Sequence, residues 1–396
     1  MSRAKKIILK IGLTVLSLLV SLILTELVIR YYLKLSEPIS DKDCRKKDEL
    51  LHHVLIPLTS CRSKTKEWDI KFKVNSLGLR DYEYNAIKPD NTFRILMLGD
   101  SFTEGYGVEI NETFSKILEK NLNFSFKQNI EVINAGITGY SPMIDYLYLQ
   151  NKGLELEPDL VILNYSMTDF YDDWKYKDKL MVDKDKAPAW EEEKMFTEKI
   201  PQSTWLPLIP TAWKWWLHQN LASYDFIALR FKKIFSAEVY KDNLQDFKKG
   251  EILTDQLAIT REKIDLNDYQ ILMNNTQNYL LEINQLLIIN NIDFMLTIIP
   301  YGHQVNGQEW NQGRSYWKFD KDKIYSSKSI EDLKLWAENN NITVINLLNS
   351  LQRESDQLNY FSVDGHWNKN GHQTAADEIY KHVVKELTGG DLSLRS

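Results

Sequence analysis

The chain has 396 residues, 43% hydrophobic and 26% charged, a composition typical of a globular protein that excludes a mainly disordered or fibrous chain. Its 49 basic and 55 acidic residues leave a formal charge of −6, so we expect no nucleic-acid partner. The two cysteines, Cys44 and Cys61, are too few for a disulfide-dense scaffold or a zinc site built from four thiolates.

The first predicted element is an apolar run, Ile7–Ile29, which the mean hydropathy of −0.39 conceals. Its length of about 23 residues can cross ~30 Å of hydrocarbon as a helix, and only Lys10 and Glu26 interrupt it. Basic residues precede the run, which favours a cytoplasmic N-terminus. We therefore expect residues 1–32 to be a basic cytoplasmic tip and an uncleaved signal anchor in the lipid bilayer of the cytoplasmic membrane. All later residues would be extracytoplasmic, in the periplasm or outside the cell.

A cleaved signal peptide is the alternative interpretation of this run. Cleavage needs small residues at the processing site. The segment that follows the run, Thr25–Leu33, offers no such pattern. The sequence therefore favours an anchor that is retained.

Residues 33–90 are interpreted as a membrane-proximal stalk and an entry segment. Both cysteines fall in this part, which is expected to lie outside the cytoplasm, where disulfides persist. A bond between Cys44 and Cys61 would close a loop of about 16 residues, which is worth ~3 kcal/mol in the chain-entropy model. Two unpaired thiols are the alternative, and the sequence does not choose between them.

Five short apolar runs with helical stretches between them follow the entry segment. Each run has the length of a fully buried strand. The runs are Phe93–Leu98, Ile130–Ile133, Leu160–Leu163, Phe294–Ile299 and Ile342–Leu347. The helical stretches include Glu112–Leu122, a stretch lined by Leu272, Tyr279, Ile283, Leu286 and Leu287, Ser329–Asn339 and Gly371–Leu387. The alternation predicts an α/β domain over residues 91–390, with a doubly wound, mainly five-stranded parallel sheet in a flavodoxin-like three-layer arrangement.

An insertion at about residues 171–265 separates the third and fourth predicted strands. It holds six of the eleven tryptophans, Trp174, Trp190, Trp205, Trp213, Trp215 and Trp216. The helical spacing of Trp213, Trp216 and Leu217 favours a cap with a small core of its own. A sugar or acyl groove and a membrane-contacting surface are the alternatives. We also expect the loop Tyr301–Ser327, at the carboxyl end of a strand, to form a wall of the site.

Residues with useful chemistry follow four of the predicted strands. The ends of parallel strands meet at one edge of a sheet, where sites form, so these segments are expected to lie together. They are Gly99–Gly105 (GDSFTEG), Asn134–Gly136 (NAG), Ser166–Asp169 (SMTD) and Asp364–Asn368 (DGHWN).

A serine nucleophile with its base is the chemistry that these residue types favour. The Ser101 hydroxyl is a weak nucleophile that needs an adjacent base, a role that His366 can perform. Asp364 can hold the imidazole tautomer and stabilise the imidazolium. The N–H groups of Ser101 and Gly136, together with Thr168, are the candidate oxyanion hole. Two further aspartates, Asp100 and Asp169, are interpreted as supports of the site loops.

The same segments carry a resemblance to a known family. The chain resembles the SGNH (GDSL-type) hydrolases, in the branch tethered by an N-terminal membrane helix. Gly99–Gly105 resembles the first block of that family, with Ser101 in the nucleophile position, and Gly136 matches the oxyanion glycine of the second block. His366 matches the base of the last block, and Asn75–Asp81 resembles what precedes the first strand in this branch. The resemblance covers residues 75–170 and 290–385 and implies the same fold with acyl-ester chemistry.

Two departures from the family pattern stand out. Thr168 occupies the position of an asparagine that serves as an oxyanion donor, and losing one good donor costs ~10²–10³ in rate. A shifted alignment would give that role to Asn164, which falls within the predicted strand. The family spacing Asp-x-x-His would also put an aspartate at Val363, whereas Asp364 lies two residues before His366.

We expect an esterase that acts on O-acyl groups, with acetyl groups of an envelope glycan as the expected substrate. Two alternatives stay open: an O-acyltransferase to a polysaccharide hydroxyl, and a non-catalytic envelope scaffold with a degraded site, which the threonine at position 168 motivates. We expect no cofactor, because nucleotide-binding motifs are missing from the sequence. We also expect no metal, because the histidines lack ligand spacing.

Overall fold

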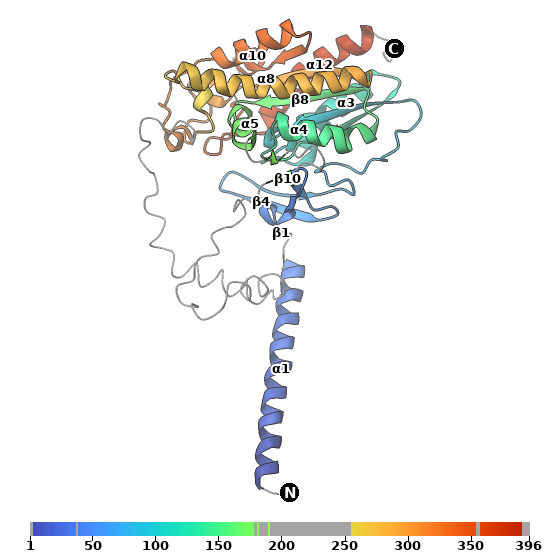
Figure 1. Ribbon diagram of the computed structural model, residues 1–396, viewed down its shortest axis with the longest axis vertical. Helices are drawn as coiled ribbons and strands as arrows, with labels where there is room; N and C mark the ends of the chain where they lie inside the picture. Colours follow the sequence, from blue (N-terminus) through green and yellow to red (C-terminus); the bar gives the residue numbers. More distant parts are fainter. Residues whose placement is uncertain are drawn as a thin grey trace. The chain divides into compact units, whose positions relative to one another are not determined.

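The computed structural model describes residues 3–36, 39–177, 180–181, 189–190, 255–353 and 357–389. The chain divides into two compact units, residues 1–38 with 192–248 and residues 39–191 with 249–396. The described part of the first unit is the helix α1 (Arg3–Ser36), and the second unit holds the sheet (Figure 1).

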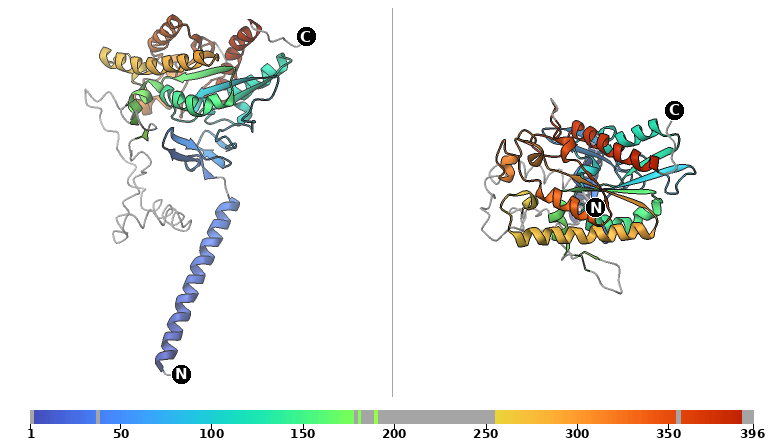
Figure 2. Two further views of the ribbon diagram at one scale, coloured as in Figure 1. Left: turned by 45° about the vertical axis from the view of Figure 1, so that its right-hand side comes forward. Right: turned by 90° about the horizontal axis from the view of Figure 1, so that it is seen from above.

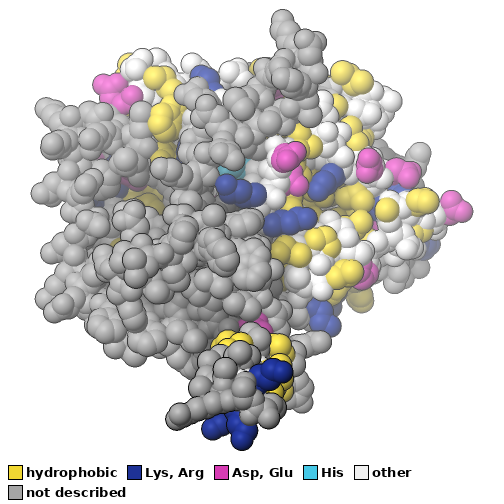
Figure 3. All heavy atoms as spheres, turned by 60° about the horizontal axis from the view of Figure 1, so that its bottom comes forward, with side chains coloured by type: hydrophobic (Ala, Val, Ile, Leu, Met, Phe, Trp, Pro, Cys, Tyr) yellow, Lys and Arg dark blue, Asp and Glu magenta, His cyan; other side chains and the backbone are white. Residues whose placement is uncertain are grey.

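Helix α1 carries apolar side chains that are open to the surroundings. Leu13, Leu16 and Leu22 are each more than half exposed. At its N-terminal end, basic and hydrophobic side chains lie next to one another (Figure 3). Across the described ranges, no helix reaches the length and apolarity that crossing a membrane requires. The anchor therefore stays a prediction.

The second unit is built on a five-stranded sheet in which every strand pair is parallel, with the order β12-β11-β8-β6-β7. Numbered along the domain, this is the flavodoxin-like order 2-1-3-4-5 read from the other edge. The strands are β6 (Thr92–Gly99), β7 (Asn129–Asn134), β8 (Leu160–Ser166), β11 (Asp293–Ile299) and β12 (Thr343–Asn346). All five predicted strands and the predicted α/β class are confirmed.

Helices cover both faces of this sheet. One face carries α3 (Phe114–Ser125) and α12 (Lys369–Gly389), which pack against each other, and the other carries α4 (Pro142–Tyr148) and α8 (Leu266–Ile289) (Figure 2, right). All seven residues of the central strand β8 are consequently buried, which explains its continuous apolar run. The other described helices of eight or more residues are α5 (Asp169–Lys177) and α10 (Lys328–Asn339).

The strand register aligns the ends that carry the candidate site. Gly99 at the end of β6 pairs with Asn164 of β8, and Ser166 at the end of β8 pairs with Ile299 of β11. Asn134 at the end of β7 pairs with Met97 of β6. The segments that follow these strands therefore begin at one edge of the sheet.

Residues 39–74, which we call the β-module, are folded rather than a stalk. Short strands form a three-stranded sheet, β1-β4-β5, and a hairpin, β2-β3. Their bounds are β1 (Ile39–Ser40), β2 (Arg45–Asp48), β3 (His52–Leu55), β4 (Ser60–Lys64) and β5 (Asp69–Lys73). Strands such as β5 alternate exposed and buried residues, with Ile70 and Phe72 buried, and Phe72 belongs to a small core inside the module. The structure thus gives strands and a core to this part of the segment that the sequence interpreted as a stalk and an entry segment.

A disulfide bond joins Cys44 and Cys61 at the centre of the β-module. The two Cα atoms are 6.2 Å apart, and both side chains are fully buried beside Leu55, Phe72 and Val74. Of the two alternatives that the sequence left open, the structure has the disulfide. So small a core gains stability from such a cross-link.

The predictions for the insertion fall largely outside the described residues. Residues 191–254, which include Trp205, Trp213, Trp215 and Trp216, lie outside them, as does the proposed cap. Of the remaining parts of the insertion, the structure describes α5, the short pair β9 (Leu180–Met181) and β10 (Ala189–Trp190), and residues 255–265 with the 3-10 turn Ala258–Thr260.

Candidate active site

Ser101 stands on a tight turn between β6 and the short helix α2 (Ser101–Glu104). The turn needs glycine at position 99, where φ is +139° and a Cβ atom would lie 2.7 Å from the carbonyl oxygen of Asn164. Asp100 caps α2 by accepting a hydrogen bond from the Phe102 N–H at 2.9 Å. The turn thus fixes the Ser101 side chain beyond the end of the strand.

Ser101, His366 and Asp364 form one hydrogen-bonded series. The Ser101 Oγ lies 2.7 Å from the His366 Nε2. The His366 Nδ1 contacts Asp364 Oδ1, which also accepts the His366 backbone N–H at 3.1 Å. The structure brings together the three residues that the sequence singled out, and the Asp-x-His spacing does not prevent the contact. Their catalytic roles remain predictions.

The electrostatics of this series favour an ionised aspartate and a basic histidine. Burial opposes the charge on both groups, but their mutual attraction and hydrogen bond prevail. The pKa of Asp364 is held below its ordinary value by the neighbouring His366. The pKa of His366 is raised above its ordinary value by Asp364, with smaller contributions from Asp100 and Glu104. A proton arriving on His366 is therefore stabilised.

Gly136 packs tightly against the turn that carries the serine. A Cβ atom at position 136 would lie 2.5 Å from the Glu104 backbone nitrogen, so the position requires glycine. Its N–H, however, donates to the Asn134 side-chain oxygen at 3.0 Å. This N–H group, predicted to be an oxyanion donor, already has an acceptor within the protein.

The Thr168 hydroxyl is also engaged within the protein. Its oxygen lies 2.8 Å from the Ser166 Oγ, which donates toward Asp100 Oδ2 at 2.8 Å or Asp169 Oδ1 at 3.1 Å. Either hydroxyl can be the donor in the contact between Thr168 and Ser166, so the Thr168 hydroxyl has a partner inside the protein in both cases. The Asn164 side chain donates to the Leu98 carbonyl oxygen at 3.0 Å inside the sheet, so the shifted alignment finds no support.

The Ser101 N–H is the remaining predicted oxyanion donor. Among the described residues no acceptor lies within hydrogen-bond reach of it. As the first N–H of α2 it has no partner inside the helix. It is therefore the donor that this arrangement leaves available to a substrate oxygen.

Ser166 was not singled out in the sequence, yet it links the two aspartates that were. Its hydroxyl stands between Asp100 and Asp169, and all three side chains are buried. Burial raises the pKa of both carboxyls, and the hydrogen bond from Ser166 opposes this for Asp100. Asp169 also accepts the Ser166 N–H at 3.0 Å. Both aspartates thus hydrogen-bond within the loops that follow β6 and β8, and their role as supports of the site stays a prediction. The sequence signal for Ser166 was a serine at the end of a buried strand.

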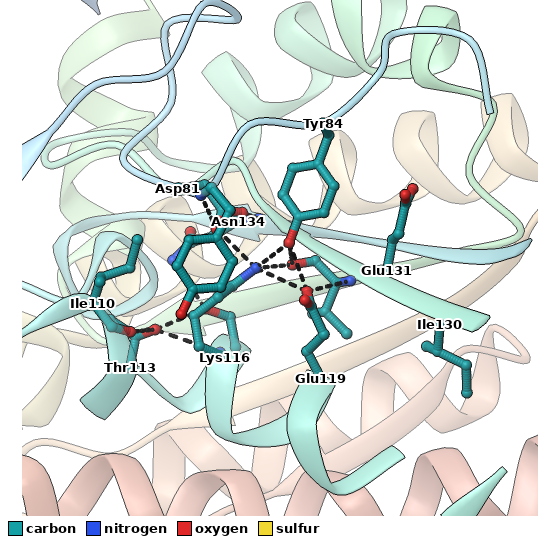
Figure 4. A network of polar contacts seen from close by, with 12 residues as sticks. Asp81, Tyr84, Ile110, Thr113, Lys116, Glu119, Ile130, Glu131 and Asn134 are labelled. Carbon is teal, nitrogen blue, oxygen red and sulfur yellow. Dashed lines mark hydrogen bonds and ion pairs between the residues drawn. The ribbon is translucent and has the colours of Figure 1, made fainter. Parts of the chain in front are cut away.

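A buried polar network around Lys116 is hydrogen-bonded to the Asn134–Gly136 loop (Figure 4). The Lys116 ammonium lies 2.8 Å from Asp81 Oδ1 and 2.9 Å from Glu119 Oε2, and it donates to the Tyr84 hydroxyl at 2.6 Å. Asp81 Oδ2 accepts the Asn134 N–H at 2.7 Å. Burial raises the pKa of Asp81 to about 6 despite the opposing lysine charge. The entry segment therefore fixes the second site loop through its aspartate.

Aromatic rings surround the histidine of the series. The ring of Phe102 lies 4.9 Å from that of His366, and the ring of Tyr106 lies 5.1 Å from it. Trp367 is fully buried and packs against Phe102. The rings limit the orientations of the imidazole and the access of water to it.

No family model matches the chain, and no curated protein matches it either. Solved structures do show similarity. The lipase/acylhydrolase from Enterococcus faecalis is 13% identical with a TM-score of 0.38, covering 77% of this chain and 99% of its own. The esterase EstA from Pseudoalteromonas sp. is 17% identical with a TM-score of 0.36, covering 76% and 100%. A protein assigned to the G-D-S-L lipolytic family from Desulfitobacterium hafniense is 12% identical with a TM-score of 0.36, covering 73% and 98%. At these scores the similarities carry no argument, so the function is argued from the site.

Proposed function

We propose that this chain is a serine acyl hydrolase that cleaves O-acyl esters. The observation that carries the proposal is the hydrogen-bonded series from Ser101 through His366 to Asp364. These residues come from segments 265 positions apart in the chain, and they meet at the edge where α/β sheets bind ligands. The resemblance of their motifs to SGNH hydrolases points to the same chemistry.

The geometry fits a two-step acyl transfer. The Ser101 Oγ attacks the ester carbonyl carbon while His366 Nε2 takes its proton. The tetrahedral oxyanion is stabilised by the Ser101 N–H. His366 then returns the proton to the departing alkoxide, which leaves an acyl group on Ser101. A water molecule then attacks this acyl group while His366 takes its proton, and His366 gives that proton to the departing Ser101 Oγ, which releases the carboxylic acid and restores the serine.

An O-acyl group on an envelope glycan, with acetyl as the simplest case, is the substrate class that we propose. A sugar hydroxyl in place of water in the second step would make the same site an O-acyltransferase. The base treats either acceptor alike, since both are O–H groups that lose a proton to His366. Acceptor choice is therefore an outcome of the experiment below.

A non-catalytic binding protein is the second candidate, and one observation favours it. The N–H of Gly136 and the hydroxyl of Thr168 both have acceptors inside the protein. With one donor in place of three, stabilisation of the oxyanion is weaker. Under this candidate the site would bind an acyl glycan without turning it over.

We further propose that the chain is anchored in the cytoplasmic membrane by Ile7–Ile29 and faces outward. Three hydroxyls in the described part of α1 donate to backbone carbonyls of their own helix, Thr14 to Lys10 at 3.0 Å, Ser17 to Thr14 at 2.9 Å and Thr25 to Ser21 at 2.8 Å. Hydroxyls that make their hydrogen bonds within their own helix are compatible with a lipid environment. A disulfide in the β-module fits an oxidising compartment. Alkaline phosphatase fused after residue 61 should be active if this topology is correct.

The test of the proposed function uses the full chain in detergent and a fluorophosphonate probe. We expect labelling of the wild type and none of Ser101→Ala, together with release of p-nitrophenol from p-nitrophenyl acetate by the wild type alone. Absence of both labelling and turnover in a folded wild type would leave the binding-protein candidate. Turnover that requires an added glycan acceptor would identify a transferase.

A further inference from the structure

The β-module contacts the loop that carries Asp364 through the side chain of Glu67. This residue lies in the turn between β4 and β5. Its two carboxylate oxygens accept the backbone N–H groups of Val363 at 3.0 Å and Asp364 at 2.8 Å. These N–H groups belong to the loop that presents Asp364 to His366. A residue of the entry region thus holds a loop almost 300 positions later in the chain.

The turn that carries Glu67 is itself fixed. The Thr65 hydroxyl accepts the N–H groups of Glu67 at 3.0 Å and Trp68 at 3.3 Å, and the Thr65 N–H donates to the Trp68 carbonyl at 2.9 Å. The preceding strand carries Cys61, which the disulfide ties to Cys44. Little freedom remains for the carboxylate to move away from the loop.

Trp68 extends the contact to the other side of the imidazole. Its ring lies 4.7 Å from that of Phe361 and 5.3 Å from that of Tyr106, and the Tyr106 ring in turn packs on His366. Gly107, with φ +93°, makes room for this packing, because a Cβ there would lie 2.5 Å from the Phe361 ring. The β-module therefore contacts two groups that adjoin His366, namely the loop that carries Asp364 and the ring of Tyr106.

We propose that Glu67 is a positioning residue of the active site, which keeps the Asp364 carboxylate against the His366 Nδ1. This inference rests on the proposed esterase function for its kinetic consequence, but not for its structural one. A carboxylate that accepts two N–H groups is a strong local restraint, since each bond is charge-assisted. Small displacements of a catalytic group cost large factors in rate, up to ~10²-fold for ~1 Å.

The test compares Glu67→Ala and Glu67→Gln with Asp69→Asn as the matched control. Asp69 is two residues away on the same hairpin, and its carboxylate contacts only Arg62 and Lys64 among the described residues. We expect Glu67→Ala to lower kcat/KM about 10- to 100-fold through kcat, with KM changed no more than ~2-fold. Glu67→Gln keeps one acceptor oxygen, so its kcat/KM should lie between those of Glu67→Ala and the wild type. The kcat/KM of Asp69→Asn should stay within ~2-fold of the wild-type value.

The pH profile distinguishes positioning from general destabilisation. The charged groups that face His366 are Asp364 on its own loop, Asp100 before α2 and Glu104 within it. His372, behind it, is kept neutral by burial. If the Asp364 carboxylate moves away from the His366 Nδ1, the pKa of His366 falls. The acid limb of the kcat/KM profile should therefore move to lower pH in Glu67→Ala and stay in place in Asp69→Asn.

Two measurements do not depend on turnover. Amide hydrogen exchange of the segment 361–368 should rise in Glu67→Ala, and an NMR titration of the histidine rings should show the lower pKa of His366. Unchanged exchange overturns the contact, and faster exchange with unchanged activity and unchanged His366 pKa overturns the positioning role. If the wild type turns over no ester, the proposed function fails, and the exchange and the titration decide on Glu67.

Discussion

The candidate site has a base side and an oxyanion side, which differ in whether their side chains and N–H groups are arranged as catalysis needs them. On the base side, Ser101 is hydrogen-bonded to His366, and His366 is hydrogen-bonded to Asp364. On the oxyanion side, the Gly136 N–H donates to the Asn134 side chain, and the Thr168 hydroxyl is hydrogen-bonded to the Ser166 hydroxyl. Proton transfer needs three side chains that are hydrogen-bonded in series, and the loops that carry them can fix this arrangement when the chain folds. An oxyanion hole needs unpaired donors aimed at empty space, and a folded chain tends to satisfy such donors itself.

Removing the nucleophile or the base should have the largest effect. Ser101→Ala and His366→Ala each break the series at a group that must exchange the proton. We expect kcat/KM to fall by ~10⁴-fold or more in each variant, with the double variant no worse than the single ones. Steady-state kinetics with p-nitrophenyl acetate measures the loss. Additive losses in the double variant would show that the two residues do not act as a unit.

Asp364→Asn should have the next largest effect, about 10²- to 10⁴-fold on kcat/KM, because the imidazolium loses its partner. The sign of the pH effect follows from the raised pKa of His366 in the wild type. Deprotonated His366 is the active form, so activity rises through this pKa, and removing the negative charge moves the rise to lower pH. A pH–rate profile in which the acid limb stays in place would show that Asp364 does not set the basicity of His366.

Replacing Cys44 and Cys61 by serine tests the support of the base side. The β-module should lose ~3 kcal/mol of stability, since its small core gives up the cross-link. Thermal unfolding of the full chain, followed by tryptophan fluorescence, should show a lower Tm for the double variant. A reductant should lower the Tm of the wild type in the same way and leave the variant unchanged. Equal melting of all samples would mean that the disulfide contributes no stability.

Thr168→Val should have the smallest effect. Its hydroxyl is committed to Ser166, so removing it costs little oxyanion stabilisation. We expect kcat/KM within ~3-fold of the wild type, against the ~10²–10³-fold typical of an oxyanion donor. A loss in the larger range would show that the Thr168 hydroxyl turns toward the substrate during the reaction, so that both sides of the site would then offer the groups that catalysis needs.

The sequence predicted much of the fold and part of the site. The five strands were recognisable because each is a short apolar run that the sheet buries on both faces, as in β8. Ser101 was recognisable because its segment directly follows such a run, β6. His366 was recognisable from the resemblance of Asp364–Asn368 to the last SGNH block, although the helix Leu348–Leu351 separates it from β12. Glu67 gave no signal of this kind, since it lies in a polar turn far from every strand of the main sheet. Its role comes from a contact between distant segments, Glu67 and Val363–Asp364.

By itself, the sequence determined the class of fold, the edge of the sheet that carries the site and the residue types available there. These follow from periodicity and from the turn chemistry of glycine and aspartate, which are local properties. Only the tertiary structure decided that residues 39–74 are a folded module, that Cys44 and Cys61 are bonded, and that the N–H of Gly136 is occupied. Each of these depends on which groups meet after the chain has folded, because a hydrogen bond or a disulfide belongs to two partners, and spacing along the chain does not choose the second one.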